Sequence, residues 1–263
     1  MTKQLIRGLQ KFHDEYYLAH RAEFEQLAHG QHPRVLFITC SDSRIDPTLI
    51  TQVDVGEIFV IRNAGNIIPP FGAANGGEGA TLEYALNALD IREIVVCGHS
   101  HCGAMKGLLK LDKLEEGMPL VYNWLKHTEA TRRVLQDSYS HCDREALIDI
   151  AIAENVLTQL ENLRTYPVVR SKLHRNQLAL HGWIYNIEAG EVLAYDPVLH
   201  EFVSPDKAHP APEPEYNLHA SCPIPATTQK TNEKQLLPSV QIGLPGRSRL
   251  STQQADRIYR GSR

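Results

Sequence analysis

Two short apolar runs, each leading to cysteine or histidine, constrain this chain more than any other feature. The first covers residues 35–38 and continues through Thr39 to Cys40. The second covers residues 94–96 and leads to Cys97, His99 and Cys102. A short apolar run bounded by polar turn residues is typical of a strand buried on both faces of a parallel sheet. The chain is therefore predicted to have an α/β fold.

The polar residues that follow these two runs predict a metal site. Ligands of open α/β sheets bind at the carboxyl ends of the strands, so neighbouring parallel strands bring Cys40, His99 and Cys102 together. Two thiolates and one imidazole form a tetrahedral zinc set with a fourth position left for water or a carboxylate. Taken alone, Cys40 also fits a buried structural thiol.

The order of the motifs resembles one family. The pattern C-x-D-x-R at residues 40–44 and the pattern H-x-x-C at 99–102 resemble those of the β-class carbonic anhydrases. The stretches 59–66 and 76–84 between them look similar to the same family. The resemblance covers roughly residues 1–205, and the core looks closest to the cyanobacterial carboxysomal branch.

The resemblance implies a fold and an activity. The fold is a mostly parallel central sheet of four strands flanked by helices, with an edge strand from a hairpin around residues 188–191 and a flexible C-terminal extension. The activity is the reversible hydration of CO2 to bicarbonate and a proton by a zinc-bound hydroxide. One zinc ion per chain is expected, bound by Cys40, His99 and Cys102.

Asp42 and Arg44 are the expected catalytic pair. Held by the Arg44 guanidinium, Asp42 stays ionised and off the metal, where it accepts a hydrogen bond from the nucleophile. If the pair breaks, the resemblance implies that Asp42 becomes the fourth zinc ligand and closes the site. The closed branch has tryptophan three residues before the first zinc cysteine, whereas this chain has Phe37, which favours the open branch. A surface ion pair is the alternative.

Five further residues are expected to bind substrate. Gln31 occupies the position of an amide that holds substrate across the dimer interface in the open branch, and Gly103 offers a backbone amide to bicarbonate. The apolar CO2 pocket is expected to include Phe59, Ala64 and Tyr84. Ordinary core remains an alternative for Phe59, and a surface amide for Gln31. His101 is excluded as a ligand because neighbouring residues rarely bind one tetrahedral ion.

Apolar spacing predicts the helices. An N-terminal helix over 2–29, stopped by Gly30 and Pro33, is expected to reach over a partner subunit, with packing on its own domain as the alternative. Further helices are predicted over residues 48–51, 76–89, 103–111, 120–131 and 145–163. The 63–79 segment is predicted to be a loop whose Ile67, Ile68 and Phe71 line a cleft or an interface.

The composition changes near Pro205. The last 59 residues contain eight of the 15 prolines and few apolar clusters, so they cannot bury enough apolar surface to fold alone. We divide the chain into a catalytic domain (1–204), a linker (205–252) and a basic tail (253–263). By resemblance, the tail binds the carboxysome scaffold, and the enzyme supplies CO2 to Rubisco there; a solvated end is the alternative. The expected tail contacts are Arg257, Ile258, Tyr259 and Arg260.

Composition excludes some classes of function. The net charge of −4 gives no reason to expect nucleic acid as a partner, and no apolar run approaches the roughly 18 residues of a membrane span. Five cysteines without a CxxC pair, behind an N-terminus unlike a signal peptide, favour the reducing cytoplasm. By resemblance, the protein is a homodimer or a higher oligomer of dimers.

Two other functions fit parts of the sequence. The same fold and metal support the hydrolysis of carbonyl sulfide or carbon disulfide, which differs in the substrate tunnel. A scaffold adaptor with a structural zinc is the second. Asp42, Arg44 and Gln31 argue against the adaptor, because a structural zinc site does not need them.

Overall fold

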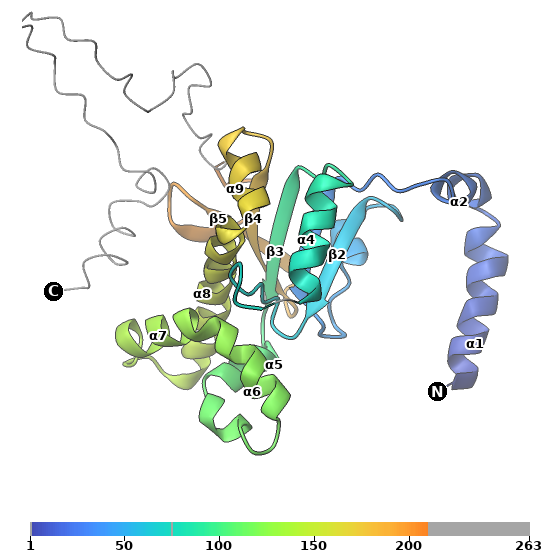
Figure 1. Cartoon of the computed structure of the whole chain (residues 1–263). Helices are drawn as coiled ribbons and strands as arrows, with labels where there is room; N and C mark the ends of the chain where they lie inside the picture. The colour runs from blue at the N-terminus through green and yellow to red at the C-terminus, as the bar shows by residue number, and fades with distance from the viewer. Residues whose placement is uncertain (1, 75, 210–263) are drawn as a thin grey trace, which may run out of the picture.

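The fold is built on a single six-stranded sheet. The computed structural model describes residues 2–74 and 76–209, and its strand order is β2-β1-β3-β4-β5-β6 (Figure 1). The first four strands in this order are parallel, and β5 and β6 are antiparallel additions at one edge. The predicted parallel core and hairpin edge are confirmed, and β6 was not predicted. The strands are β1 (Val35–Cys40), β2 (Ile58–Asn63), β3 (Glu93–His99), β4 (Ala179–Asn186), β5 (Glu191–Asp196) and β6 (Glu201–Val203).

Helices connect the strands and cover the sheet. The α-helices are α1 (Thr2–Lys11), α2 (Arg21–Leu27), α3 (Pro47–Thr51), α4 (Gly77–Asn87), α5 (Gly103–Leu108), α6 (Pro119–Leu125), α7 (Glu129–Ser138), α8 (Arg144–Thr165) and α9 (Pro167–His174). Short helices of other types are η1 (Phe12–Tyr17), η2 (Leu111–Leu114) and η3 (Lys126–Thr128). Among the described residues, no helix is both long and apolar enough to span a bilayer.

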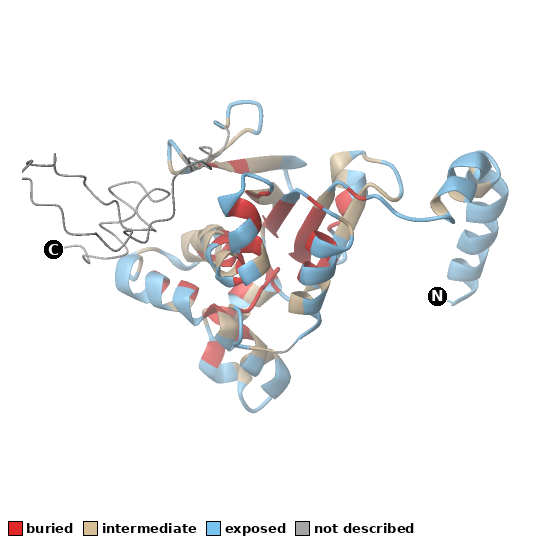
Figure 2. Ribbon diagram, turned by 45° about the horizontal axis from the view of Figure 1, so that its top comes forward, coloured by how far each residue is buried: buried red, intermediate tan, exposed pale blue. Residues whose placement is uncertain are grey.

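The two faces of the sheet are buried differently. Side chains alternate between the faces of a strand, so Leu36 and Ile38 of β1 point to one face and Phe37 to the other. The first face packs against α4, α8 and α9 and forms the largest apolar cluster of the described chain. The second face carries a smaller cluster of Phe37, Val95 and Cys97, completed by strand residues such as Trp183. Figure 2 shows the buried residues concentrated on the strands and on the helix surfaces that face them.

The N-terminal helix is not continuous, which corrects the prediction of one helix over 2–29. A π-helical turn follows α1, and His20 leaves helical geometry at φ −112° and ψ 22° before α2 begins. Aromatic packing explains the break, since it brings the Phe24 ring against those of Phe12 and Tyr17 with centroids 5.9 and 5.4 Å away. The resulting arm projects away from the domain (Figure 1).

Two features in the middle of the chain differ from the expectations. The helix predicted over 145–163 is α8, but a further helix, α9, follows at Pro167 and was not predicted; proline suits the first position of a helix, where no amide hydrogen is needed. Ile67 and Ile68 do not line a cleft, since both are fully buried in the core, whereas Phe71 is 60% exposed. The proposed linker (from residue 210 onward) and the basic tail lie outside the described residues.

Candidate metal centre

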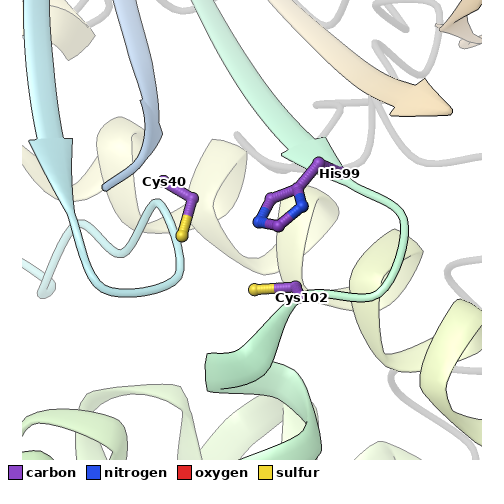
Figure 3. Close-up of side chains that lie close together, drawn as sticks. All are labelled: Cys40, His99 and Cys102. Atoms are coloured by element: carbon purple, nitrogen blue, oxygen red, sulfur yellow. The ribbon is translucent and has the colours of Figure 1, made fainter. Parts of the chain in front are cut away.

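The three predicted metal ligands meet at the carboxyl edge of the sheet. β1 and β3 are adjacent and parallel, with Thr39 opposite Cys97, so Cys40 and His99 end their strands side by side. Cys102 follows after a two-residue loop. The ligand atoms of Cys40, His99 and Cys102 lie within 4.8 Å of one another, all three residues are buried, and both sulfurs and the imidazole converge (Figure 3).

A hydrogen bond from one ring nitrogen of His99 leaves the other nitrogen available to a metal ion. The Nδ1 of this ring lies 2.9 Å from the carbonyl oxygen of Ser100, which makes Nδ1–H the donor and leaves a lone pair on Nε2. That Nε2 is buried and has no hydrogen-bond partner among the described residues. A buried nitrogen without a partner is unfavourable unless a ligand satisfies it, so the imidazole of His99 fits a metal ion.

The two thiols also fit a divalent cation. Hydrogen bonding from Cys102, with further contributions from His99 and the Gly65 amide, lowers the pKa of Cys40, while Cys40 and burial raise the pKa of Cys102. Two buried thiols this close cannot both ionise easily, because like charges in a dry site repel. A bound zinc ion removes the conflict, since it stabilises both thiolates together.

A network from α8 fixes the loop behind Cys40. The Gly65 amide donates to Cys40 Sγ at 3.4 Å, and the Gly65 carbonyl accepts from Asn155 Nδ2 at 3.0 Å. Gln159 extends the network by donating to Asn155 and accepting from the Ile68 amide. The sequence analysis missed these residues, because their contacts join positions about ninety residues apart.

Asp42 and Arg44 form the predicted pair beside the ligands. Arg44 donates from Nε and Nη2 to the two carboxylate oxygens of Asp42 at 2.9 and 2.8 Å. These bonds hold the pKa of Asp42 well below its usual range, so the carboxylate stays ionised. Asp42 Oδ2 lies 3.9 Å from His99 Nε2, outside the group of three ligands.

Arg62 is a second residue that the sequence analysis left without a role. Its guanidinium donates to the carbonyl oxygens of Cys40, Asp42 and Ile45 at 3.2, 2.8 and 2.9 Å. One side chain of β2 therefore holds the whole loop that carries the first ligand and the carboxylate. The motif at 59–66 marked this position, but only the fold shows which carbonyls it reaches.

Comparisons with known proteins agree with this geometry. The family model for carbonic anhydrase matches residues 35–192. A carbonic anhydrase of Synechocystis sp. is 62% identical and covers 99% of this chain and 100% of its own. The solved structure of the β-carbonic anhydrase CcaA is 70% identical over 78% of this chain and 99% of its own, with a TM-score of 0.77. One of two tetrameric β-carbonic anhydrases from Sordaria macrospora is 28% identical over 73% of this chain and 93% of its own, with a TM-score of 0.60.

The chain belongs to the β-class carbonic anhydrases. Its similarity along nearly the whole Synechocystis enzyme places it in the cyanobacterial branch. The enzyme is therefore a carbonic anhydrase, a lyase that interconverts CO2 and bicarbonate. Zinc is the metal of this family, and Cys40, His99 and Cys102 are placed to bind it.

Only some of the expected substrate residues of this carbonic anhydrase lie beside its own ligands. Gly103 directly follows Cys102, and nothing lies within 4 Å of where its side chain would begin. Ala64 directly follows β2 next to Gly65, and its carbonyl accepts from Trp124 Nε1 at 2.8 Å. Both residues are exposed at the carboxyl edge of the sheet.

Gln31, Phe59 and Tyr84 of the carbonic anhydrase lie elsewhere. Gln31 precedes β1, whose six residues span about 20 Å, so it lies at the opposite edge of the sheet from Cys40. In the pairing of β1 with β2, Phe59 lies four residues before the partner of Cys40, or about 13 Å along the strand. The Tyr84 ring packs near Phe59, with centroids 6.1 Å apart, and is 51% exposed.

Proposed function

We propose that the chain hydrates CO2 at the Cys40–His99–Cys102 centre, with Asp42 and Arg44 as its catalytic pair. The observation that carries this proposal is the fork between Arg44 and Asp42 next to three converged ligands. When bound, zinc supplies a Lewis acid that lowers the pKa of water from about 15.7 to near 7, so that a nucleophile forms at neutral pH.

Asp42 orients the reacting water in this proposal. Its carboxylate is ionised, is 18% exposed and lies 3.9 Å from the metal-facing nitrogen of His99. An ionised carboxylate only accepts hydrogen bonds, so Asp42 accepts one from the nucleophile and thereby turns the nucleophile's lone pair toward CO2. Arg44 keeps the carboxylate in that position and off the metal. The exposed Gly103 amide is the proposed donor to bicarbonate.

The first experiment is stopped-flow CO2 hydration at about pH 8 with metal analysis of the same samples. The parent should contain one zinc per chain and hydrate CO2 rapidly. Asp42→Asn should keep its zinc and lose about 10² or more in kcat/KM, since a neutral amide is a weaker acceptor than the carboxylate. Cys40→Ser should lose both zinc and activity.

Ser43→Ala serves as the matched control, because Ser43 is exposed in the same loop. It should behave like the parent. Zinc at full occupancy without hydration in the parent at any pH from about 7 to 9 would contradict the proposal, because zinc-activated water, with a pKa near 7, is ionised across that range. Unchanged hydration in Asp42→Asn would contradict the role of the carboxylate alone.

We also propose that the complete site belongs to a dimer. Gln31, Phe59 and Tyr84 are away from the ligands of their own chain, and the apolar side chains of α1 find little cover within it: Leu5 and Leu9 are 66% and 68% exposed. The second sheet face carries a hollow of about 250 Å³ lined in part by Phe37, Val95 and Trp183. A second copy whose arm packs on this face covers both the apolar side chains of α1 and the hollow. The tetrameric state of the Sordaria enzymes fits assembly from such dimers.

The basic tail is proposed to recruit the enzyme to the carboxysome, where it supplies CO2 to Rubisco. Support comes from the cyanobacterial relative, which matches 99% of this chain and so includes the tail. Two apolar residues, Ile258 and Tyr259, lie between Arg257 and Arg260 and suit a peptide that docks in a groove. Ile258→Ala with Tyr259→Ala should abolish co-sedimentation with carboxysome scaffold protein at unchanged hydration rates. Arg257→Lys, which keeps the charge, is the control.

A further inference from the structure

The turn between β4 and β5 contacts the loop that joins two of the metal ligands. β3 and β4 are parallel with His99 opposite Tyr185, so the chain leaves both strands at the same level. The Ser100 amide donates to the Tyr185 carbonyl at 2.9 Å, and the Ile187 amide donates to Ser100 Oγ at 3.0 Å. The loop of Ser100 and His101 is therefore tied to the hairpin.

One carboxylate of that turn contacts both loop residues. Ser100 Oγ donates to Glu188 Oε2 at 3.0 Å, and the Nε2 of His101 pairs with Glu188 Oε1. His101 has a positive φ of 57°, a conformation that non-glycine residues adopt with strain and keep where their surroundings hold them. The carboxylate holds the side chain of this strained residue directly before Cys102.

The turn holds Glu188 itself in place. Asn186 Oδ1 accepts from the amides of Glu188 and Ala189, both at 3.1 Å, and the Asn186 carbonyl accepts from Gly190 at 2.9 Å. This is the local pattern by which an asparagine side chain fixes a turn. Gly190 supplies the positive φ of 68° that the turn needs. The backbone that presents the carboxylate is therefore well defined.

The contact reaches the metal centre through Ser100. The Ser100 carbonyl binds Nδ1 of His99 at 2.9 Å, and this bond sets both the orientation of the ring and the nitrogen that is left for the metal. A group that hydrogen-bonds to a metal ligand contributes to metal affinity because it fixes the orientation of that ligand. Any shift of Ser100 moves the imidazole.

We propose that Glu188 is a positioning residue of the metal centre, which fixes His99 through Ser100 and Cys102 through His101. The inference deepens the proposed function, because it concerns the same centre. Glu188 and His101 are 58% and 50% exposed, and an isolated ion pair at that exposure contributes little. The double contact with the only two residues between His99 and Cys102 distinguishes Glu188 from such a pair.

The test is the rate at which the holoenzyme loses zinc to a chromogenic chelator. Glu188→Ala should release zinc about tenfold faster than the parent, the effect typical of losing a partner behind a ligand. Glu188→Gln keeps an acceptor for the Ser100 hydroxyl and should stay within about twofold of the parent. Glu191→Ala is the matched control, since Glu191 is exposed on the same hairpin and its side chain has no hydrogen bond within the described ranges.

A cobalt-substituted enzyme gives a second readout. The absorption bands of Co²⁺ report the geometry of its thiolate and imidazole ligands, so Glu188→Ala should shift them and Glu188→Gln should restore them. In the double variant Ser100→Ala with Glu188→Ala, the increase in zinc release should be smaller than the sum of the two single effects. The reason is that the carboxylate acts partly through Ser100.

The outcomes separate this inference from the proposed catalytic role of Asp42. Parent-like zinc release and cobalt spectra in Glu188→Ala would overturn the positioning role, whatever the hydration rate. Slower hydration in both Glu188 variants with unchanged zinc release would also overturn it, because the carboxylate would then act on the reaction and not on the metal ligands. Failure of Asp42→Asn to affect hydration leaves the zinc-release result valid.

Discussion

The carboxyl edge of the sheet and the N-terminal arm differ in how far contacts within one chain bury and hold their residues. At the sheet edge the ligands are buried, and Arg62, Gly65 and Asn155 hold their loops by hydrogen bonds within the chain. On the arm, no residue of α1 or α2 is buried. The metal centre is thus held by contacts within one chain, whereas the helices of the arm bury no residue against their own chain.

Removing the arm is the strongest way to break this comparison. Deletion of residues 2–29 should convert the proposed dimer to a monomer, lower kcat/KM by about 10² or more, and leave one zinc per chain. The loss follows because substrate groups from the second copy no longer reach the metal centre. Sedimentation velocity, stopped-flow hydration and metal analysis on one preparation measure all three quantities.

A point variant gives the same test with a matched control. Leu5→Asp adds a charge to the apolar face of α1, and Gln4→Asp adds the same charge one residue earlier. Dissociation in the first variant but not in the second would localise the interface. A monomer that hydrates CO2 at the parental rate would show that one chain holds a complete site.

Gly65→Ala should damage the metal centre from within one chain. Gly65 has a φ of +88°, and an added Cβ would lie 2.9 Å from Ala104 Cβ and 3.2 Å from Met105 Cε. The loop must move, and with it the amide that binds Cys40, so hydration should fall about tenfold, as for other losses behind a ligand. Stopped-flow hydration with zinc analysis measures this.

Gly72→Ala separates the contact from the backbone strain. Gly72 lies in the same loop with a φ of +84° and has nothing within 4 Å. Both variants carry the strain of about 1–2 kcal/mol for a left-handed residue, but only Gly65→Ala adds the clash. Equal losses of activity in the two variants would attribute the effect to strain and refute the specific role of Gly65.

Mixed dimers test where Phe59 acts. In a dimer of Cys40→Ser with Phe59→Ala, a site shared between subunits leaves one centre with intact ligands and an intact Phe59. Such a dimer should have about half the parental activity if Phe59→Ala alone is strongly impaired. If Phe59 serves its own chain, the mixed dimer has only half the activity of the Phe59→Ala dimer. Tandem-affinity purification of the mixed species followed by stopped-flow hydration decides between them.

The same division explains what the sequence could predict. The strands at residues 35–40 and 93–99 could be predicted directly, because buried parallel strands are continuous apolar runs. The polar residues at the ends of these runs predicted the metal ligands. The residues behind the ligands could not be predicted, because Arg62, Asn155 and Glu188 act through contacts between distant elements. The interruption of the N-terminal helix at His20 could not be predicted for a similar reason. The apolar spacing indicated one continuous helix, but the ring of Phe24 packs back against Phe12 and Tyr17. β6 has only three residues, too few for a strand pattern.

The smallest expected effect is on the stability of the fold and concerns Asp196 on β5, away from the metal centre and the arm. Asp196 is fully buried and accepts from the amides of Val198, Leu199 and His209 and from the His209 ring at 2.7 to 3.0 Å. Burial opposes ionisation, but these hydrogen bonds offset it and place the pKa of Asp196 below its ordinary range. A carboxylate with a depressed pKa stabilises the fold above its unfolded pKa of about 3.9 and loses that contribution as the pH falls further.

Asp196→Asn should therefore lower the urea midpoint of unfolding by the same amount at about pH 8 and pH 6, and by less below about pH 4. Zinc content and sedimentation should stay at parental values, because the residue touches neither the metal centre nor the arm. Glu201→Gln, an exposed carboxylate on the neighbouring strand β6, is the control and should leave the midpoint unchanged. A difference that persists undiminished below pH 4 would mean that Asp196 contributes through packing, because an ionised carboxylate must lose its advantage as it is protonated.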